Sequence, residues 1–278
     1  MENRRDPGRG RMPWVFTDVD WTLIPPRREI SKRNADAISA YTRAGGRVSL
    51  ASGRHHLALR SLVSALGLEC PQIAGNGSVV FDSRGERLLA GIADRGPEAE
   101  GRLRASRIPH VLYTVRGLFL QSSDVTDDHL ALLVAVFHDY RPARSAPTDP
   151  EKLFKILTFI DSTDLERDRA VREIGAASGL KAERTGPSFL ELISPEAGKG
   201  RAIQRILAED HWPAEQAAAV GDSQNDISML RVVGIPAAVG NAGPEVKRAA
   251  TRLLPPCDED GFAVLLEEFL ATCQVSQP

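Results

Sequence analysis

Four short segments of the sequence hold residue types that could carry out chemistry, and they lie far apart along the chain. The first is Asp18 to Leu23 (DVDWTL), directly after the apolar run Trp14 to Thr17. Two carboxylates one residue apart can serve as a nucleophile and as an acid–base group. Such pairs are also common turn formers after a strand, so this segment alone does not predict an activity.

Two further segments could bind an anion. Ser52 and Gly53 lie in the segment ASGR, at the start of a predicted helix, where a hydroxyl and free N–H groups can hold a phosphate. Lys199, in the segment AGKG, opens another predicted helix and adds a positive charge. The plainer interpretations are an ordinary helix cap for Ser52 and a solvated surface side chain for Lys199.

The fourth segment, Gly221 to Leu230 (GDSQNDISML), adds two carboxylates, Asp222 and Asp226, with Asn225 between them. Carboxylates gathered at one place repel each other unless a cation joins them, and oxygen ligands favour Mg²⁺. A helix cap would explain one of these aspartates, but it hardly explains both together with Gly221 and Asn225.

Apolar runs and helical patterns alternate around these segments, which predicts a parallel sheet covered on both faces. Ligands of such a sheet bind at the carboxyl ends of its strands, and the first, second and fourth segments each follow a strand. The expected strands are 14–17, 48–51, 72–74, 217–220, 235–239 and 252–254, and the expected helices include 31–46, 55–67 and 226–233.

The middle of the chain breaks this pattern. Glycine turns at Gly85, Gly117 and Gly186 predict three hairpins, and 127–140 and 165–178 read as helices with a strand at 155–160 between them. We therefore expect an α/β fold with a parallel-sheet core domain at 13–86 and 195–272. An α+β domain is inserted at 87–194, and residues 1–12 form a disordered tail.

The order of the four segments resembles the haloacid dehalogenase superfamily of phosphohydrolases. Asp18 and Asp20 match its first motif, Ser52 its second, Lys199 its third, and Asp222 with Asp226 its fourth. The resemblance implies a Rossmann-like core with an inserted cap. The cap between the second and third motifs, the segment Ile73 to Gly77 and the segment Phe189 to Leu192 are similar to the Cof-like branch, which has a type IIB cap.

The resemblance implies a phosphatase that works through an aspartyl-phosphate. Asp18 would attack phosphorus, and Asp20 would protonate the leaving oxygen and then activate water. Mg²⁺ would be held by Asp18, by the main-chain carbonyl of Asp20 and by Asp222. Asp226 would orient Lys199 or a metal-bound water from behind the ligands. The residues expected to bind the phosphorylated substrate are Ser52, Gly53, Asn76, Lys199 and Asn225.

The implied substrate is a small phosphorylated metabolite, with a sugar phosphate as the first expectation. A phosphosugar mutase using the same nucleophile and a non-catalytic phosphosugar-binding protein are the alternatives. On the cap, His110, Arg116 and Lys155 could meet the substrate, whereas His55 and His56 read as surface residues at a helix start.

One residue departs from the family pattern, because Trp21 stands where glycine usually follows the second aspartate. Glycine tolerates unusual dihedral angles and leaves room beside the phosphate. Trp21 must fit an ordinary backbone conformation or reshape the entrance, and its ring could pack under the cap or stack on a substrate ring.

Bulk properties agree with a small-molecule enzyme. The chain has 278 residues, a formal net charge of -2 and three cysteines without a CxxC pattern. These values predict neither nucleic-acid binding nor a disulfide framework or structural zinc site. No apolar run has the length of a signal core or a membrane span, so we expect a cytoplasmic protein without a membrane partner. Nothing in the sequence indicates an oligomeric state.

Overall fold

The structure is a computed structural model that describes residues 12–26, 29–120, 123–137 and 152–275. The chain divides into two compact units. Unit 1 comprises Met1–Ala51, Val63–Cys70 and Ile203–Pro278, and unit 2 comprises Ser52–Leu62 and Pro71–Ala202. The expected domain boundaries at 86/87 and 194/195 stay a prediction. The expected disordered tail lies outside the described residues, apart from Met12, which is buried.

Unit 1 contains a five-stranded sheet in which every neighbouring pair is parallel, as the strand–helix alternation predicts. Both central strands are buried along their whole length, so both faces of the sheet are covered, as is usual for parallel sheets. The α/β fold class is confirmed. The strands, in spatial order, are β13 (Arg252–Leu253), β12 (Ile235–Ala238), β11 (Ala217–Gly221), β1 (Trp14–Thr17) and β2 (Arg47–Leu50).

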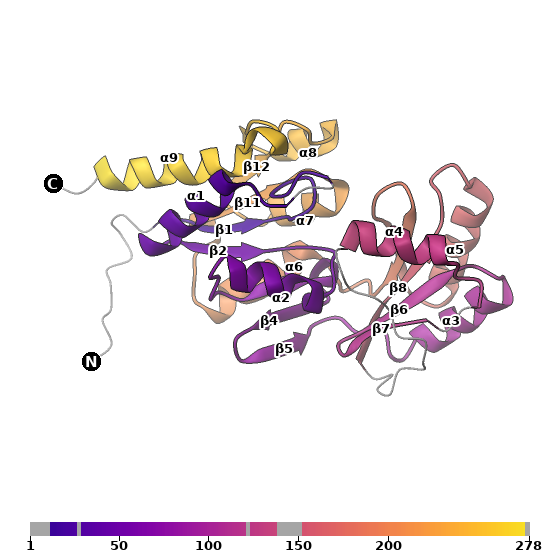
Figure 1. The fold of residues 1–278 in the computed structure, drawn as a ribbon. Coiled ribbons are helices and arrows are strands. Elements are labelled where there is room, and N and C mark those ends of the chain that lie inside the picture. Colours follow the sequence, from indigo (N-terminus) through magenta and orange to yellow (C-terminus); the bar gives the residue numbers. More distant parts are fainter. Residues whose placement is uncertain (1–11, 27–28, 121–122, 138–151, 276–278) are drawn as a thin grey trace. The chain divides into compact units, whose positions relative to one another are not determined.

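Two helices of unit 1 pack together on one side of this sheet (Figure 1). Helix α1 (Lys32–Arg43) begins at Ser31, whose hydroxyl accepts a hydrogen bond from the N–H of Asn34 at 3.0 Å. The buried side chain of Asn34 donates to the carbonyl of Leu23 and accepts from the N–H of Ala263, near the start of α9 (Gly261–Val275). One amide therefore ties the loop after β1 to both helices.

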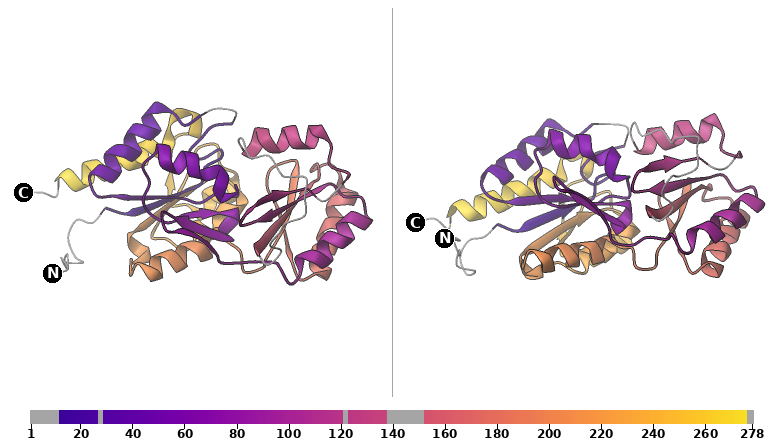
Figure 2. Two further views of the ribbon diagram at one scale, coloured as in Figure 1. Left: turned by 60° about the horizontal axis from the view of Figure 1, so that its bottom comes forward. Right: turned by 90° about the horizontal axis from the view of Figure 1, so that it is seen from below.

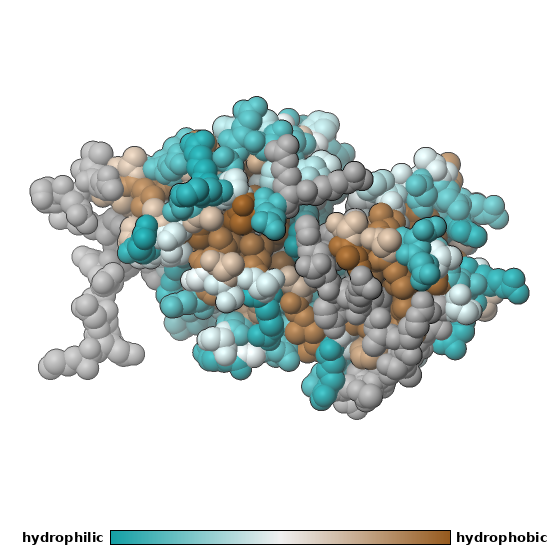
Figure 3. Space-filling view, viewed as in Figure 1, coloured by the Kyte–Doolittle hydropathy of each residue, from teal (hydrophilic) through white to brown (hydrophobic). Residues whose placement is uncertain are grey.

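Helices α7 (Ile227–Leu230) and α8 (Pro244–Ala249) also lie in unit 1, whereas α2 (His56–Ala65) and α6 (Lys199–Glu209) each have residues in both units. Helix α7 is shorter than expected at both ends, because Asp226 belongs to a 3₁₀ turn over 224–226 and the helix ends at Leu230 and not at Val233. Figure 3 shows hydrophilic side chains over the outer side of α8, which fits a helix whose buried residue is Val246.

Unit 2 contains a five-stranded antiparallel sheet. Helices α3 (Gly96–Ala105) and α5 (Leu165–Ala177) pack together on one face, and α4 (Asp127–Phe137) lies on the opposite face (Figure 2). The apolar core beneath α3 and α5 includes Leu103, Leu112, Ile156, Val171 and Leu192. The strands are β7 (Gly117–Phe119), β6 (His110–Thr114), β8 (Leu153–Phe159), β10 (Phe189–Ile193) and β9 (Lys181–Arg184).

A second, three-stranded sheet of unit 2 corrects one expectation. Strand β3 (Gln72–Ala74) forms where the sequence predicts it, but it pairs antiparallel with β4 (Val79–Asp82) and so does not extend the parallel sheet. The chain reverses between them through the 3₁₀ turn Gly75–Gly77, and β4 then forms the predicted hairpin with β5 (Gly85–Leu88).

Two helices of unit 2 differ from the prediction. Helix α3 was not expected, because Gly96, Pro97 and Gly101 disfavour a helix on propensity alone. Proline is tolerated in its first turn, and ion pairs from Glu98 to Arg102 and from Glu100 to Arg104 add support. The predicted end of α4 at Tyr140 lies outside the described residues.

None of the helices in the described part of the chain combines the length and the apolar sequence needed to cross a membrane.

Candidate active site

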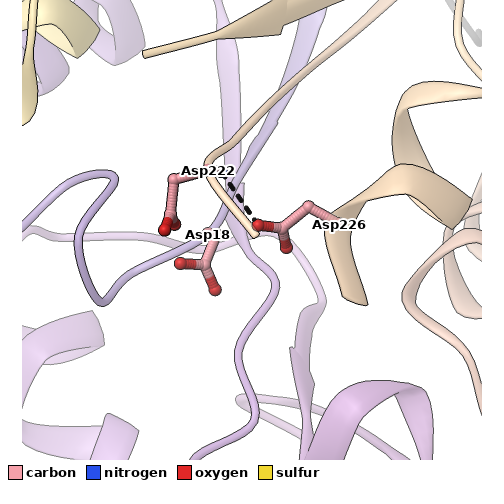
Figure 4. A group of neighbouring side chains, drawn as sticks. All are labelled: Asp18, Asp222 and Asp226. Carbon is pink, nitrogen blue, oxygen red and sulfur yellow. Dashed lines mark hydrogen bonds between the residues drawn. The ribbon is translucent and has the colours of Figure 1, made fainter. Parts of the chain in front are cut away.

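Three carboxylates meet at the carboxyl edge of the parallel sheet in unit 1. Asp18 follows β1 directly and Asp222 follows β11, and these strands are parallel neighbours with Thr17 beside Val220. The N–H of Asp18 donates to the carbonyl of Val220 at 2.9 Å. One carboxylate oxygen from each of Asp18, Asp222 and Asp226 lies within 4.8 Å of the others (Figure 4). The sheet thus joins residues about 200 positions apart, as the sequence predicts.

The carboxylate of Asp226 is held by the backbone of the segment that carries Asp222. Its Oδ2 accepts hydrogen bonds from the N–H groups of Asp222 and Ser223, each at 3.0 Å. Figure 4 shows the first of these bonds. Gly221 makes this approach possible, because a Cβ there would lie 2.5 Å from the Cβ of Asp226. Asp226 therefore fixes the turn that presents Asp222.

These three side chains fit a hard divalent cation. Two negative charges 4.8 Å apart repel each other by roughly 3.5 kcal/mol at an effective dielectric constant of about 20. Asp18 and Asp226 are buried, so solvent relieves little of this repulsion. An all-oxygen donor set is the kind that Mg²⁺ and Ca²⁺ prefer. The third carboxylate of this cluster is that of Asp226, which was expected behind the metal ligands. Binding of the cation by the main-chain carbonyl of Asp20 stays a prediction.

The loop that follows Asp18 is tightly hydrogen-bonded. The N–H of Leu23 and that of Ile24 both donate to the carbonyl of Val19, at 3.0 and 2.8 Å. Thr22 is fully buried, and its hydroxyl donates to Oδ1 of Asp222 at 2.7 Å. Nothing in the sequence predicts this bond. It orients Oδ1 of Asp222 from the neighbouring strand end.

Trp21 answers the question raised by the missing glycine. Its φ is 67°, so the tryptophan adopts the left-handed conformation for which glycine is usual. The amide of Asn241 donates to the Trp21 carbonyl at 2.8 Å, and its oxygen accepts from the N–H of Cys257. Trp21 is 53% exposed, and the packing of its ring under the cap stays a prediction. Asn241 holds a strained backbone beside Asp20.

The other predicted residues, apart from Asp20 and Asn225, lie in unit 2. The N–H of Asn76 donates to the carbonyl of Ser52 at 3.0 Å, and a Cβ on Gly53 would lie 3.0 Å from Oδ1 of Asn76. Gly77 packs against the backbone of Gly198, next to Lys199, which is buried at the start of α6. Unit 2 therefore brings together Ser52, Gly53 and Asn76. Lys199 directly follows Gly198, whose backbone contacts the turn Gly75–Gly77 that contains Asn76.

Asn225 is half-buried in unit 1, and the Ser223 hydroxyl donates to its Oδ1 at 2.5 Å. Asp20 is also half-buried and forms an isolated bridge with Ile24.

The histidines at the start of α2 are not surface residues, contrary to the sequence-based interpretation. His55 and His56 are each about 1% exposed, and their rings stack with centroids 4.4 Å apart. Burial lowers the pKa of His55 to about 3 and that of His56 to about 4. Nε2 of His55 bonds to the carbonyl of Thr114 at 2.7 Å, and Nδ1 accepts from the N–H of Leu57. Both rings are therefore neutral at pH 7, and they belong to the core of unit 2.

Two of the three cap residues considered for substrate contact are buried. His110 is fully buried, and its Nδ1 bonds to the carbonyl of Ile108 at 2.8 Å. Lys155 is fully buried and forms an ion pair with Glu191 at 2.9 Å. Arg116 is exposed on the turn between β6 and β7.

Comparison with known proteins decides the family. The family model described as haloacid dehalogenase-like hydrolase matches residues 15–266. The chain belongs to this family. The match spans all four motifs and both units, so the recognition of a haloacid dehalogenase-type phosphatase with a Cof-like cap is confirmed, and with it the enzyme class.

Individual relatives are similar to this protein over almost the whole length of both chains. The chain is 27% identical to the 5-amino-6-(5-phospho-D-ribitylamino)uracil phosphatase YwtE of Bacillus subtilis, over 94% of this chain and 99% of the relative. It is 24% identical to the pyridoxal phosphate phosphatase YbhA of Escherichia coli, over 92% and 98%. The fold matches that of the subclass IIB sugar phosphatase BT4131 with a TM-score of 0.79, at 21% identity over 93% and 99%.

Proposed function

We propose that this protein is a Mg²⁺-dependent phosphomonoesterase that hydrolyses a small phosphorylated metabolite through an aspartyl-phosphate on Asp18. The observation that carries the proposal is the position of Asp18. Its carboxylate directly follows a central strand and shares one sheet edge with the carboxylates of Asp222 and Asp226. A nucleophile that must approach an anionic phosphate needs such a cation-binding set beside it.

The proposed roles follow from the chemistry of each side chain. One oxygen of Asp18 attacks phosphorus, and its other oxygen would help to hold the cation. Asp20, on the same loop and partly exposed, protonates the leaving oxygen and afterwards removes a proton from the attacking water. Asp18, the Asp20 carbonyl and Asp222 would hold Mg²⁺. When bound, Mg²⁺ would offset the repulsion between the carboxylate and the phosphate.

The transferring phosphoryl group needs hydrogen-bond donors around its oxygens. We assign this role to the Ser52 hydroxyl, the Gly53 N–H, the Lys199 ammonium and the Asn225 amide, with Asn76 beside them. Asp226 keeps the Asp222 segment in place through its two backbone hydrogen bonds. Support for placing all of these in one site comes from the family membership and from the order of the four motifs.

The proposed substrate class is a sugar or polyol phosphate. Two relatives are named as phosphatases of a phosphoribityl compound and of pyridoxal phosphate, and a protein of the same fold is named as a sugar phosphatase. Each of these names refers to a small phosphorylated metabolite, and the part of the molecule that carries the phosphate differs among them.

The test is release of inorganic phosphate from a panel of phosphorylated metabolites, with Mg²⁺ and after chelation with EDTA. We expect release that depends on Mg²⁺ and disappears in Asp18→Asn. Asp36→Asn is the matched control, because Asp36 is an exposed carboxylate on α1 paired with Lys32, and it should behave as the wild type. Isomer formation without free phosphate would indicate a mutase. Wild-type rates in Asp18→Asn would refute the proposed nucleophile.

A further inference from the structure

A buried ion pair lies on the five-stranded sheet of unit 2. Lys155 on β8 and Glu191 on β10 are diagonal neighbours on adjacent antiparallel strands, with Nζ and Oε1 2.9 Å apart and no exposed side-chain surface on either. Removing two charges from water costs several kcal/mol per ion, and such a pair survives only where further hydrogen bonds satisfy its atoms. The further hydrogen bonds of Lys155 and Glu191 therefore identify the segments of unit 2 that this ion pair fixes.

Lys155 reaches from the sheet to the segment after β2. Its ammonium donates to the carbonyl of Gly53 at 2.9 Å and lies 4.1 Å from the centre of the Tyr113 ring. The donor is charged and fully buried, which makes its hydrogen bond stronger than one between neutral groups. The Gly53 carbonyl is therefore anchored to β8, which lies about 100 residues further along the chain.

Glu191 anchors the same segment through Asn76. Its Oε2 accepts a hydrogen bond from Nδ2 of Asn76 at 3.0 Å, which fixes the amide with Oδ1 turned toward Gly53. The N–H of Asn76 in turn donates to the Ser52 carbonyl at 3.0 Å. Burial raises the pKa of Glu191, while Lys155 and Asn76 act in the opposite direction by stabilising the carboxylate.

These contacts determine where the N–H of Gly53 points. In a trans peptide the N–H is directed opposite to the preceding C=O. Since the Ser52 carbonyl faces the Asn76 N–H, the Gly53 N–H points away from Asn76. The next carbonyl, that of Gly53, is held by Lys155, so consecutive peptide groups are both fixed.

We propose that Lys155, Glu191 and Asn76 are positioning residues that fix the Ser52–Gly53 peptide groups for phosphate binding. This inference rests on the proposed function, in which Ser52 and the Gly53 N–H hold phosphoryl oxygens. It moves Lys155 from a candidate substrate contact to a residue that acts through the Gly53 carbonyl. It also explains why the sheet of unit 2 buries two charges, although an apolar pair would pack there at lower cost.

The test uses the double variant Lys155→Met/Glu191→Gln in the full chain. Methionine has a similar length without the ammonium, and glutamine can still accept from Asn76, so no unpaired charge is buried. The control is Thr158→Val on the same strand β8. Its buried hydroxyl donates to the carbonyl of Leu190 at 2.7 Å, away from the Ser52–Gly53 segment.

Inorganic phosphate is the probe, measured as a competitive inhibitor of hydrolysis alongside kcat, KM, Mg²⁺ affinity and Tm. We expect the inhibition constant for phosphate to rise roughly tenfold or more in the double variant, with Mg²⁺ affinity unchanged. In Thr158→Val, Tm should fall while the phosphate constant stays at the wild-type value. If the double variant does not fold, Lys155→Met/Glu191→Met, which replaces the ion pair by an apolar pair, should show the same rise in the inhibition constant.

The outcomes separate the inference from the proposed function. A folded double variant with wild-type phosphate inhibition and wild-type kcat/KM would overturn the positioning role, and so would an equal loss in Thr158→Val. A wild-type protein that neither releases phosphate from the panel nor binds inorganic phosphate would instead contradict the proposed function.

Discussion

Replacing Gly221 by alanine tests how the carboxylate cluster is built. Gly221 is the last residue of β11, and its φ is not in the left-handed region, so its backbone tolerates alanine. The added Cβ would lie 2.5 Å from the Cβ of Asp226 and 2.8 Å from its Oδ2, where ordinary contacts begin at 3.4 Å. Asp226 must therefore retreat by 3.4 − 2.5 = 0.9 Å at Cβ and by 3.4 − 2.8 = 0.6 Å at Oδ2.

This displacement is large enough to break the hydrogen bonds of Asp226. Its Oδ2 accepts from the N–H groups of Asp222 and Ser223 at 3.0 Å each, and a retreat of 0.6 Å can lengthen each bond to as much as 3.6 Å. A hydrogen bond to a charged acceptor contributes about 1.5–3 kcal/mol. Ser223 is exposed and water can replace part of the loss, so the lower end applies and the free energy of unfolding should fall by about 3 kcal/mol.

The loss should also reach the metal site, because residues behind metal ligands typically account for about 10- to 100-fold in affinity. Calorimetric titration with Mg²⁺ and urea unfolding measure the two effects. Gly101→Ala is the control, since a Cβ there meets no atom within 4 Å, and alanine within α3 should stabilise the protein by up to about 1 kcal/mol. Wild-type Mg²⁺ affinity and stability in Gly221→Ala would refute the role assigned to Asp226.

Three further predictions concern single side chains. Thr22→Val removes the bond to Oδ1 of Asp222 and should weaken Mg²⁺ binding about tenfold in calorimetry; unchanged affinity would mean that the bond does not orient Asp222. His56 has a pKa lowered from 6.5 to about 4, so the unfolded chain takes up its proton first as the pH falls below 6.5, and stability is lost between 6.5 and 4. Between pH 7 and pH 5 the free energy of unfolding of the wild type should therefore fall by up to about 2 kcal/mol more than that of His56→Phe, as measured by urea unfolding. An identical pH profile for the two proteins would contradict the burial effect. Because φ of Trp21 is 67°, the free energy of unfolding of Trp21→Val should be about 1–2 kcal/mol lower than that of Trp21→Gly in urea unfolding. Equal free energies would show that the left-handed conformation is not retained.

The sequence predicts the parallel sheet and the carboxylate cluster because both depend on local patterns. Buried strands such as 14–17 and 217–220 are short apolar runs, and the polar residues that follow a parallel strand must appear at its carboxyl edge. Asp18, Asp222 and Asp226 therefore meet, although nothing in their separate segments specifies a distance.

The parts that the sequence did not predict depend on tertiary contacts. From the sequence, Lys155 is a candidate substrate contact and Glu191 has no assigned role, because only the pairing of β8 with β10 buries both charges together. His55 and His56 read as exposed helix ends, but the stacked rings are covered by Tyr113, Phe154 and Phe81. Local propensity carries no information about such neighbours.

Tertiary packing also explains the helix that the sequence does not predict. Helix α3 contains Gly96 and Gly101, which weaken it in isolation, but Ala99 and Leu103 are buried in the core of unit 2 and favour the helix. Trp21 is the opposite case, because it occupies a backbone conformation suited to glycine with the help of the Asn241 amide.

The central claim is that Asp18 accepts the phosphoryl group, and a trapping experiment with Asp20→Asn tests it most directly. p-Nitrophenyl phosphate has a leaving group that departs without protonation, so this variant should form the aspartyl-phosphate but hydrolyse it slowly. After mixing with Mg²⁺ and quenching in acid, peptide mass spectrometry should find one phosphoryl group on Asp18. Release of p-nitrophenol with no phosphorylated peptide, or with the phosphoryl group on another residue, would contradict the mechanism.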